Sequence, residues 1–248
     1  MNGSIVRSEM KPFPGFDQLF ELHDPVADRP YRGAFGHPNA AKLSRAEENV
    51  AAAVQVTWAM GSGVPEDIVW TTSAHALIVS ARVRESFGEA GLEGWKTYPV
   101  DVFDKNGVLC PGYAGLAIVG RCGRIDLERS SILLKSYPGG YFPHFRGHFF
   151  EESSWDGSDF CVDRPDDLGK WSMNRIVTRR VVDLLQTRGV SNVRCTSLVE
   201  VTTQTSTFEI GLAHLLPWDF QARIASAYRE AGVPTPESVP RAARSKPS

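Results

Sequence analysis

The chain has 248 residues, of which 42% are hydrophobic and 23% are charged, and its formal net charge is −2. This composition supplies enough apolar side chains for a packed core and excludes a mainly disordered chain. A nearly neutral charge gives no general attraction to nucleic acid or to a membrane surface. The apolar stretches are far shorter than the roughly 20 residues that a membrane-spanning helix needs.

Cysteine usage points to a reducing compartment. Cys110, Cys122, Cys161 and Cys195 are far apart and form no CxxC pair, and the first residues show no basic-then-apolar signal-peptide pattern. A chain of this length does not need disulfides to build a stable core. We therefore expect a cytoplasmic protein with reduced thiols.

The N-terminal segment, residues 1–67, is expected to form an arm and a helix. Five prolines among the first 40 residues favour irregular structure. Ser44 and Glu47 have the spacing of a capping box, and apolar residues at helical spacing follow. Since Gly61-Ser62-Gly63 would end the helix, the pattern predicts a helix over 45–60.

A pattern near the middle of the chain occurs again 98 positions later. In each copy a short β-branched run ends at a residue that can cap a helix, Ser80 in the first copy and Thr178 in the second. A buried i, i+4 pair, a glycine at the helix end and a second strand follow. The pattern predicts two related helix–strand units, with these equivalent residues: Ile78 and Ile176, Val79 and Val177, Arg82 and Arg180, Val83 and Val181, Gly91 and Gly189.

The whole chain is therefore predicted to be an α+β protein with a mixed or antiparallel sheet and a few packed helices. Its body would span residues 68–232 and contain the duplication, with an apolar stretch at 208–216 and a short helix at 222–231. The proline- and serine-containing residues 233–248 are expected to form a flexible tail.

Only one group of residues has the content of a metal site. His144 and His148 are four positions apart and are followed by several carboxylates, which together could ligate zinc or iron. Pro143 and Gly147 argue against the helix that would bring the two histidines to one face, so we expect a polar, aromatic loop and no metal. The sequence has no phosphate-binding loop, dinucleotide fingerprint, HExxH or GxSxG motif, so no cofactor and no catalytic residue are predicted.

The segment 151–167 has the most uneven charge, with seven carboxylates against Arg164. Such a run is usually a solvated loop. It could also attract a basic partner, with aromatic residues as anchors. On this second interpretation, the predicted partner-binding residues are Glu151, Glu152, Trp155, Asp156, Asp159, Phe160 and Asp163.

Short motifs in the body resemble those of a known protein family. They include Val69-Trp70, Leu77-Ile78-Val79-Ser80, Gly91-Leu92-Glu93-Gly94, Gly123-Arg124-Ile125-Asp126, Ser158-Asp159-Phe160 and Gly189-Val190-Ser191-Asn192-Val193. Over about residues 68–202 the chain resembles the immunity protein family eleven group of bacterial polymorphic toxin systems, formerly a domain of unknown function. Thr178 stands where the family usually has serine. The resemblance carries no catalytic residues.

The resemblance implies a non-enzymatic cytoplasmic protein that binds and neutralises a cognate toxin, with no nucleic acid or membrane as partner. Two alternatives remain open. One is a metal-dependent hydrolase that uses His144, His148 and nearby carboxylates, which stoichiometric metal would indicate. The other is a regulatory or scaffold protein, which the absence of a neighbouring toxin gene would favour.

Overall fold

The computed structural model describes residues 11–25, 30–138, 140–165, 174–204 and 218–234. The predicted apolar stretch 208–216, residues 235–248 of the predicted tail, and Asp166 and Asp167 of the acidic segment lie outside these residues. The described residues form two compact units. The larger unit belongs to Met1–Arg124 and Phe150–Ser197, and the smaller to Ile125–Phe149 and Leu198–Ser248. Helices together with mixed sheets confirm the predicted α+β class.

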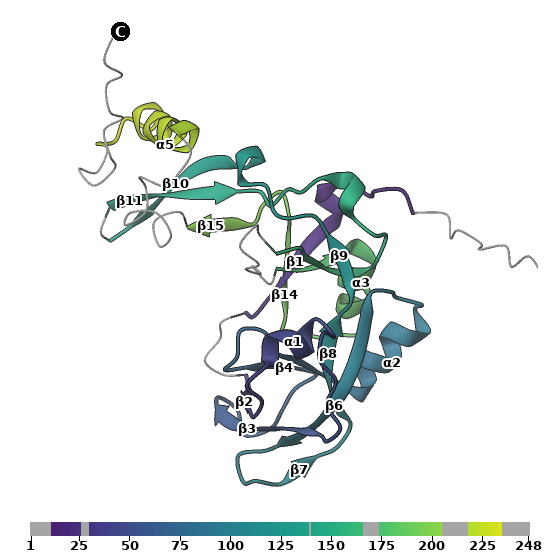
Figure 1. Cartoon of the computed structure of the whole chain (residues 1–248). Coiled ribbons are helices and arrows are strands. Elements are labelled where there is room, and N and C mark those ends of the chain that lie inside the picture. The colour runs from purple at the N-terminus through teal and green to yellow at the C-terminus, as the bar shows by residue number, and fades with distance from the viewer. Residues whose placement is uncertain (1–10, 26–29, 139, 166–173, 205–217, 235–248) are drawn as a thin grey trace, which may run out of the picture. The chain divides into compact units, whose positions relative to one another are not determined.

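The larger unit contains a barrel, shown in Figure 1. Its sheet has the strand order β3-β2-β4-β5-β8-β6-β7, and a further pairing between β3 and β6 closes it. The strands are β2 (Arg32–Phe35), β3 (Val54–Met60), β4 (Ile68–Thr71), β5 (Leu77–Ser80), β6 (Trp95–Phe103), β7 (Leu109–Cys110) and β8 (Tyr113–Ile118). Val56, Val69 and Ile78 belong to the buried cluster that fills the barrel.

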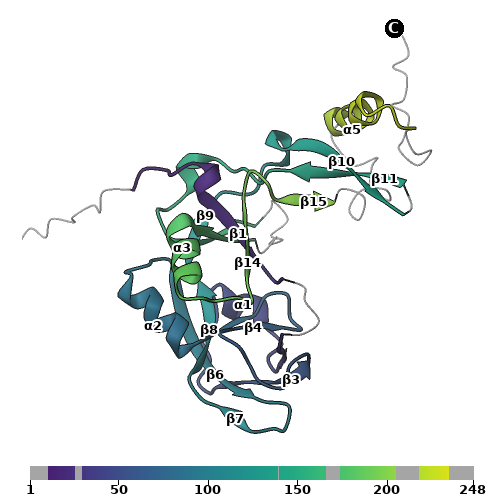
Figure 2. The same ribbon diagram turned by 180° about the vertical axis from the view of Figure 1, so that it is seen from behind.

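A five-stranded sheet of order β14-β1-β13-β12-β9 completes the larger unit. Its strands are β1 (Leu19–His23), β9 (Gly120–Cys122), β12 (Phe160–Asp163), β13 (Arg175–Thr178) and β14 (Arg194–Ser197). Helices α2 (Ala81–Glu89) and α3 (Arg179–Thr187) lie side by side, as Figures 1 and 2 show from opposite sides. The buried faces of both helices and of both sheets form one apolar cluster.

The predicted helix over 45–60 is wrong. A short helix, α1 (Ala40–Ser44), ends where that helix was expected to begin, and residues 54–60 form β3. Val54 and Val56 are buried while Gln55 and Thr57 are exposed, which is the two-residue period of a strand. The Ser44 hydroxyl donates to the carbonyl of Ala40 at 2.7 Å, and Ser44 is the last residue of α1 and not the cap of a following helix.

The two predicted helix–strand units are confirmed. Helices α2 and α3 begin after Ser80 and Thr178, and Gly91 and Gly189 have φ of +59° and +67°. Only Ser80 caps in the expected way, by accepting from the Val83 amide. The Thr178 hydroxyl accepts no such bond, although both hydroxyls donate to a carboxylate, as described below.

The strand pairings show that the correspondence between the two parts goes beyond these units, although β3, β7 and α1 have no described counterpart. In the first half, β8 lies between β5 and β6 and pairs with both. In the second half, β1 lies between the equivalent strands β13 and β14 and pairs with both in the same registers. Strand β2 likewise lies parallel to β4, as β9 does to β12. One half therefore runs from β1 to β6 and the other from β8 to β14. Each half contributes its first strand, β1 or β8, to the sheet of the other half.

Two arginines join the halves in a reciprocal way. Arg82 at the start of α2 donates to the carbonyl of Arg188, the C-cap of α3, at 2.7 Å. Arg180 at the start of α3 donates to the carbonyl of Ala90, the C-cap of α2, at 2.9 Å. A cation at a helix C-terminus satisfies an unpaired carbonyl and interacts favourably with the helix dipole.

The smaller unit is a three-stranded antiparallel sheet with one helix. The sheet has the order β10-β11-β15, with β10 (Ser131–Tyr137), β11 (Gly140–Arg146) and β15 (Thr202–Gln204). Helix α5 (Trp218–Glu230) packs on β10. The Tyr228 side chain is buried, and its hydroxyl donates to the Tyr141 carbonyl at 2.6 Å.

Glycine substitutions test the two equivalent helix ends. Gly91→Ala and Gly189→Ala should each lower the free energy of unfolding by about 1–2 kcal/mol, because alanine is strained at positive φ. Gly88 is the matched control, since it lies inside α2 without positive φ and an added Cβ would contact nothing within 4 Å. Gly88→Ala should raise the free energy of unfolding by up to about 1 kcal/mol. Urea denaturation measures all three, and equal losses at positions 88 and 91 would contradict the left-handed helix ends.

Candidate functional site

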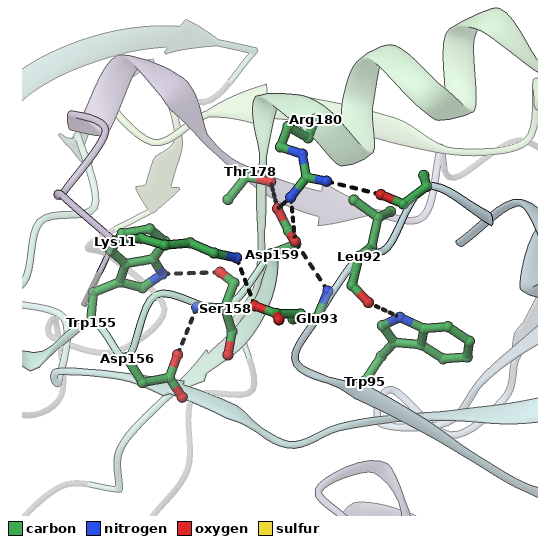
Figure 3. A network of polar contacts seen from close by, with 11 residues as sticks. Lys11, Leu92, Glu93, Trp95, Trp155, Asp156, Ser158, Asp159, Thr178 and Arg180 are labelled. Atoms are coloured by element: carbon green, nitrogen blue, oxygen red, sulfur yellow. Dashed lines mark hydrogen bonds and ion pairs between the residues drawn. The ribbon is translucent and has the colours of Figure 1, made fainter. Parts of the chain in front are cut away.

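Asp159, one of the predicted partner-binding residues, is the centre of an internal hydrogen-bond network (Figure 3). The residue is 2% exposed. Its carboxylate accepts from the Thr178 hydroxyl at 2.8 Å, from the Arg180 guanidinium at 3.0 and 3.2 Å, and from the Glu93 amide at 3.1 Å. The carboxylate therefore joins the start of β12 to the start of α3 and to the loop after α2. It has no surface to offer a partner.

Asp67 is the counterpart of Asp159 in the first half. Its carboxylate accepts from the Ser80 hydroxyl at 2.7 Å and from Arg82. The bond from Arg82 is the main cause of the lowered pKa of Asp67, and the Ser80 bond acts in the same direction. In each half, Asp67 or Asp159 therefore binds the hydroxyl residue that precedes a helix and the arginine in the first turn of that helix.

The predicted aromatic anchors are also internal. Phe160 is fully buried in the apolar cluster between the halves. Trp155 is buried, and its Nε1 donates to the Ser158 carbonyl at 3.1 Å. Its ring centroid lies 5.9 Å from that of Phe13. Asp163 is buried as well. The prediction that these residues form a partner-binding surface with Asp159 is therefore wrong, because their side chains are needed to pack the larger unit.

The exposed members of the predicted set are Glu151, Glu152 and Asp156. Asp156 covers the edge of β9: its Oδ2 accepts from the Arg121 amide at 2.6 Å, and its own amide donates to the Arg121 carbonyl at 3.1 Å. In the first half, β3 pairs with the corresponding strand β2. Among the described residues of the second half, no strand pairs with this edge of β9, and the acidic segment satisfies it instead.

Both histidines lie in the smaller unit, His144 on strand β11 instead of the predicted loop and His148 in the loop that follows β11. His144 is a buried residue of β11, stacked on Tyr137 with 5.8 Å between ring centroids, and burial lowers its pKa. His148 is buried too, with Nε2 2.7 Å from the Thr203 hydroxyl. Glu151, Glu152, Asp156 and Asp159 belong to the larger unit. Within the described part of the chain, no group of three or more possible metal ligands comes together.

A group of exposed apolar residues lies at one end of the barrel. The side chains are exposed by 41% to 67% and belong to the end of β3, the loop after it and the β6–β7 turn: Trp58, Met60, Val64, Val108 and Leu109. We call this group the barrel-end patch. Figures 1 and 2 show β3 and β7 at the same end of the barrel.

Backbone and side-chain bonds fix the two loops of the barrel-end patch. The Trp58 Nε1 donates to the Ser62 carbonyl at 3.1 Å, which holds the indole against the loop after β3. The Lys105 amide donates to the Gly63 carbonyl at 3.1 Å, which joins this loop to the β6–β7 turn. Asp104 orders the turn by accepting from the Asn106 and Val108 amides, both at 2.8 Å. The exposed side chains are thus held by a defined backbone.

Sequence reasoning missed the barrel-end patch for an identifiable reason. In the helix predicted over 45–60, Trp58 would belong to the apolar face, so that prediction gives no exposed strand residue at this position. Asn106-Gly107 is a strong hairpin signal between the strands, and it would have located the turn that presents Val108 and Leu109. No sequence signal shows that these turn residues lie beside the end of β3, because that depends on the β3–β6 pairing.

Comparison of the sequence with protein-family models and with curated proteins gives no match. The helices in the described ranges include none that is both long and apolar enough to cross a lipid bilayer. Cys110, Cys122, Cys161 and Cys195 are all free thiols.

The structural role of Asp159 predicts a large difference between two carboxylates of the acidic segment. Asp159→Ala should lower the free energy of unfolding by roughly 2–4 kcal/mol, because it leaves buried donors unsatisfied and removes the carboxylate that Arg180 binds. Glu151→Ala should change it by less than about 0.5 kcal/mol, because this side chain is exposed. Chemical denaturation of both variants gives the comparison. Similar stability of the two would show that Asp159 is not an internal support.

Proposed function

We propose that the protein is a non-enzymatic binding protein that contacts a partner protein through the barrel-end patch. The exposure of Trp58, Met60, Val64, Val108 and Leu109 on one ordered end of the barrel carries this proposal. Contiguous exposed apolar surface is unfavourable in water and typically marks a site of association. We further propose that the partner is a cognate bacterial toxin, which the protein neutralises in the cytoplasm. This second step is supported by the resemblance of residues 68–202 to immunity proteins.

The chemistry of the barrel-end patch fits a protein partner. Tryptophan is enriched among the residues that dominate binding energies, because it buries a large area at low cost in conformational entropy. The bond from Trp58 to the Ser62 carbonyl holds the indole in place before binding, which reduces that cost further. Met60 and Leu109 supply apolar area beside it, and the flexible side chain of Met60 can adapt to the partner surface.

The exposed charges of the acidic segment have a more limited role in this proposal. Glu151 and Glu152 remain exposed. Their negative charge can raise the rate of association with a basic toxin, which is an effect that salt screens. The affinity itself depends on the barrel-end patch, because the aromatic residues of the acidic segment are buried.

The function is tested by co-expressing the protein with the products of the genes next to its own, and by measuring its affinity for any product that is toxic. Trp58→Ser combined with Leu109→Ser should raise the dissociation constant by about 30-fold or more and abolish protection of the cell. The folded state should persist, because both side chains are exposed in the wild type. Tyr141→Ser is the matched control, since Tyr141 is 44% exposed in the smaller unit and should leave both binding and protection unchanged.

The outcomes separate this function from its alternatives. Full protection by the double variant would remove the barrel-end patch as the interface but retain the immunity function. Binding of a protein that is not toxic would favour the regulatory or scaffold protein. Near-stoichiometric zinc or iron in the purified protein, lost on His144→Ala, would favour the hydrolase instead.

A further inference from the structure

A solvent-accessible cavity in the larger unit lies at the first residues of β3 and shares no residue with the barrel-end patch. Its volume is about 470 Å³, which is the size of a site for a small organic molecule. The loop 48–53 forms most of its wall. Gly36 and His37, which follow β2, and Val54 and Gln55 of β3 complete the wall. We call it the loop cavity.

Two contacts hold the ends of this wall together. The Gly36 amide donates to the Gln55 carbonyl at 2.9 Å, and His37 Nε2 lies 3.7 Å from Glu48 Oε1. Because Gly36 and His37 are neighbours in the sequence, the segment 48–55 leaves and returns to the same place. Glycine permits this approach, since a Cβ at position 36 would come within 2.9 Å of the Gln55 carbonyl oxygen. The loop therefore encloses the cavity with both of its ends fixed.

The backbone of the loop is not used by the fold. Helix α1 ends at Ser44 and β3 begins at Val54. Within the described part of the chain, the amides and carbonyls of residues 48–52 take part in no hydrogen bond. Backbone amides and carbonyls are strong hydrogen-bonding groups. Those of the loop are therefore available to a ligand in the cavity.

Glu48 brings a carboxylate to the loop cavity without a cation to balance it. Among the described residues, only His37 comes within ion-pair distance. His37 Nδ1 accepts from the Asn39 amide at 3.2 Å, so this nitrogen carries no proton and the imidazole is neutral. The 3.7 Å from His37 Nε2 to Glu48 Oε1 is also longer than a hydrogen bond. The carboxylate of Glu48 is thus open to a cationic ligand.

The neighbouring carboxylate, Glu47, shows the contrast. Arg45 binds both of its oxygen atoms, with Nε at 2.9 Å and Nη2 at 2.7 Å. Glu47 does not line the loop cavity. Of two consecutive glutamates, one is therefore neutralised within the chain and the other faces the cavity.

The groups around the loop cavity fit an organic ammonium better than a metal ion. A primary ammonium has one positive charge and three donors, which match one carboxylate and several backbone carbonyls. A metal would need the lone pair of His37 Nε2, which carries the proton when Nδ1 accepts from Asn39. Val50 and the alanines at 51–53 add an apolar part to the wall, which suits an aliphatic chain.

We propose that the loop cavity binds a small aliphatic primary amine in its ammonium form, with Glu48 as the counter-ion. The Glu48 carboxylate accepts from one N–H of the ammonium group, and backbone carbonyls of the loop accept from the others. The aliphatic chain lies against Val50 and the three alanines. Charge therefore selects the head group, and the apolar wall selects the length of the chain.

The probe for the test is butylammonium, titrated into the isotope-labelled full chain at constant ionic strength with sodium chloride as the balancing salt. NMR should show saturable shifts of the amide signals of Gly36 and residues 48–53. For so small a ligand we expect a dissociation constant on the order of 1 mM. 1-Butanol and butyrate keep the aliphatic chain without the positive charge, and both should bind about tenfold more weakly or less. Methylammonium should bind several-fold more weakly than butylammonium, because it buries fewer methylene groups.

Glu48→Gln should weaken the binding of butylammonium by about tenfold, because it removes the charge-assisted contact. Glu47→Gln is the matched control, since it removes the same charge one position away and outside the cavity wall. This control variant should bind butylammonium as the wild type does. Amide signals far from the loop show whether each variant keeps its fold.

Four results would overturn the proposal. They are the lack of saturable shifts in the loop with butylammonium, equal affinity of the wild type and Glu48→Gln, equal weakening by Glu47→Gln, and equal affinity of the wild type for butylammonium and 1-butanol. The third would show general attraction by negative charge, and the last would show an apolar site in which the charge has no role. If Glu48→Gln does not fold, the comparison of butylammonium with 1-butanol and butyrate on the wild type decides the proposal.

Discussion

The guanidinium groups of Arg82 and Arg180 each join a strand of their own half to the helix of the other half. On one side each binds a carboxylate that precedes a strand, Asp67 or Asp159, and on the other the last carbonyl of the opposite helix. These paired contacts hold α2 and α3 against one another over a shared apolar core. Since β1 and β8 each lie in the sheet of the opposite half, neither half can bury its apolar surface alone. We therefore expect the larger unit to unfold cooperatively.

The same duplication explains why the acidic segment is not the surface that its composition suggests. The first half covers the outer edge of β2 with β3. In the second half the chain enters the smaller unit after β9, and the returning segment covers β9 through Asp156. The aromatic residues of the returning segment pack in the interior. The ring centroid of Phe150 lies 6.0 Å from that of Phe13 and 5.2 Å from that of Phe16. The carboxylates and aromatic residues of the acidic segment thus have structural roles: Asp156 covers the edge of β9, and the aromatic rings pack inside the larger unit. Only some of the carboxylates, such as Glu151 and Glu152, remain exposed to solvent.

The barrel-end patch differs in kind from the buried polar contacts that join the two halves. Its apolar side chains are exposed, while hydrogen bonds from Trp58 and Lys105 hold the backbone that carries them. Exposure of such side chains is unfavourable in water, and a partner with an apolar surface of its own would relieve it.

Much of the local structure followed from the sequence. A cap residue, an apolar i, i+4 pair and a glycine located α2 and α3 and the positive φ of Gly91 and Gly189, because these features depend on interactions within a single turn of helix. Val54 and Val56 alternate with polar residues, which is typical of a strand, but apolar residues at helical spacing in the same segment favoured a helix instead. The exchange of β1 and β8, the internal position of Asp159 and the exposure of Trp58 were decided only by tertiary structure. They depend on which strands pair across long sequence separations, and that pairing is set by the burial of a common core that no local pattern contains.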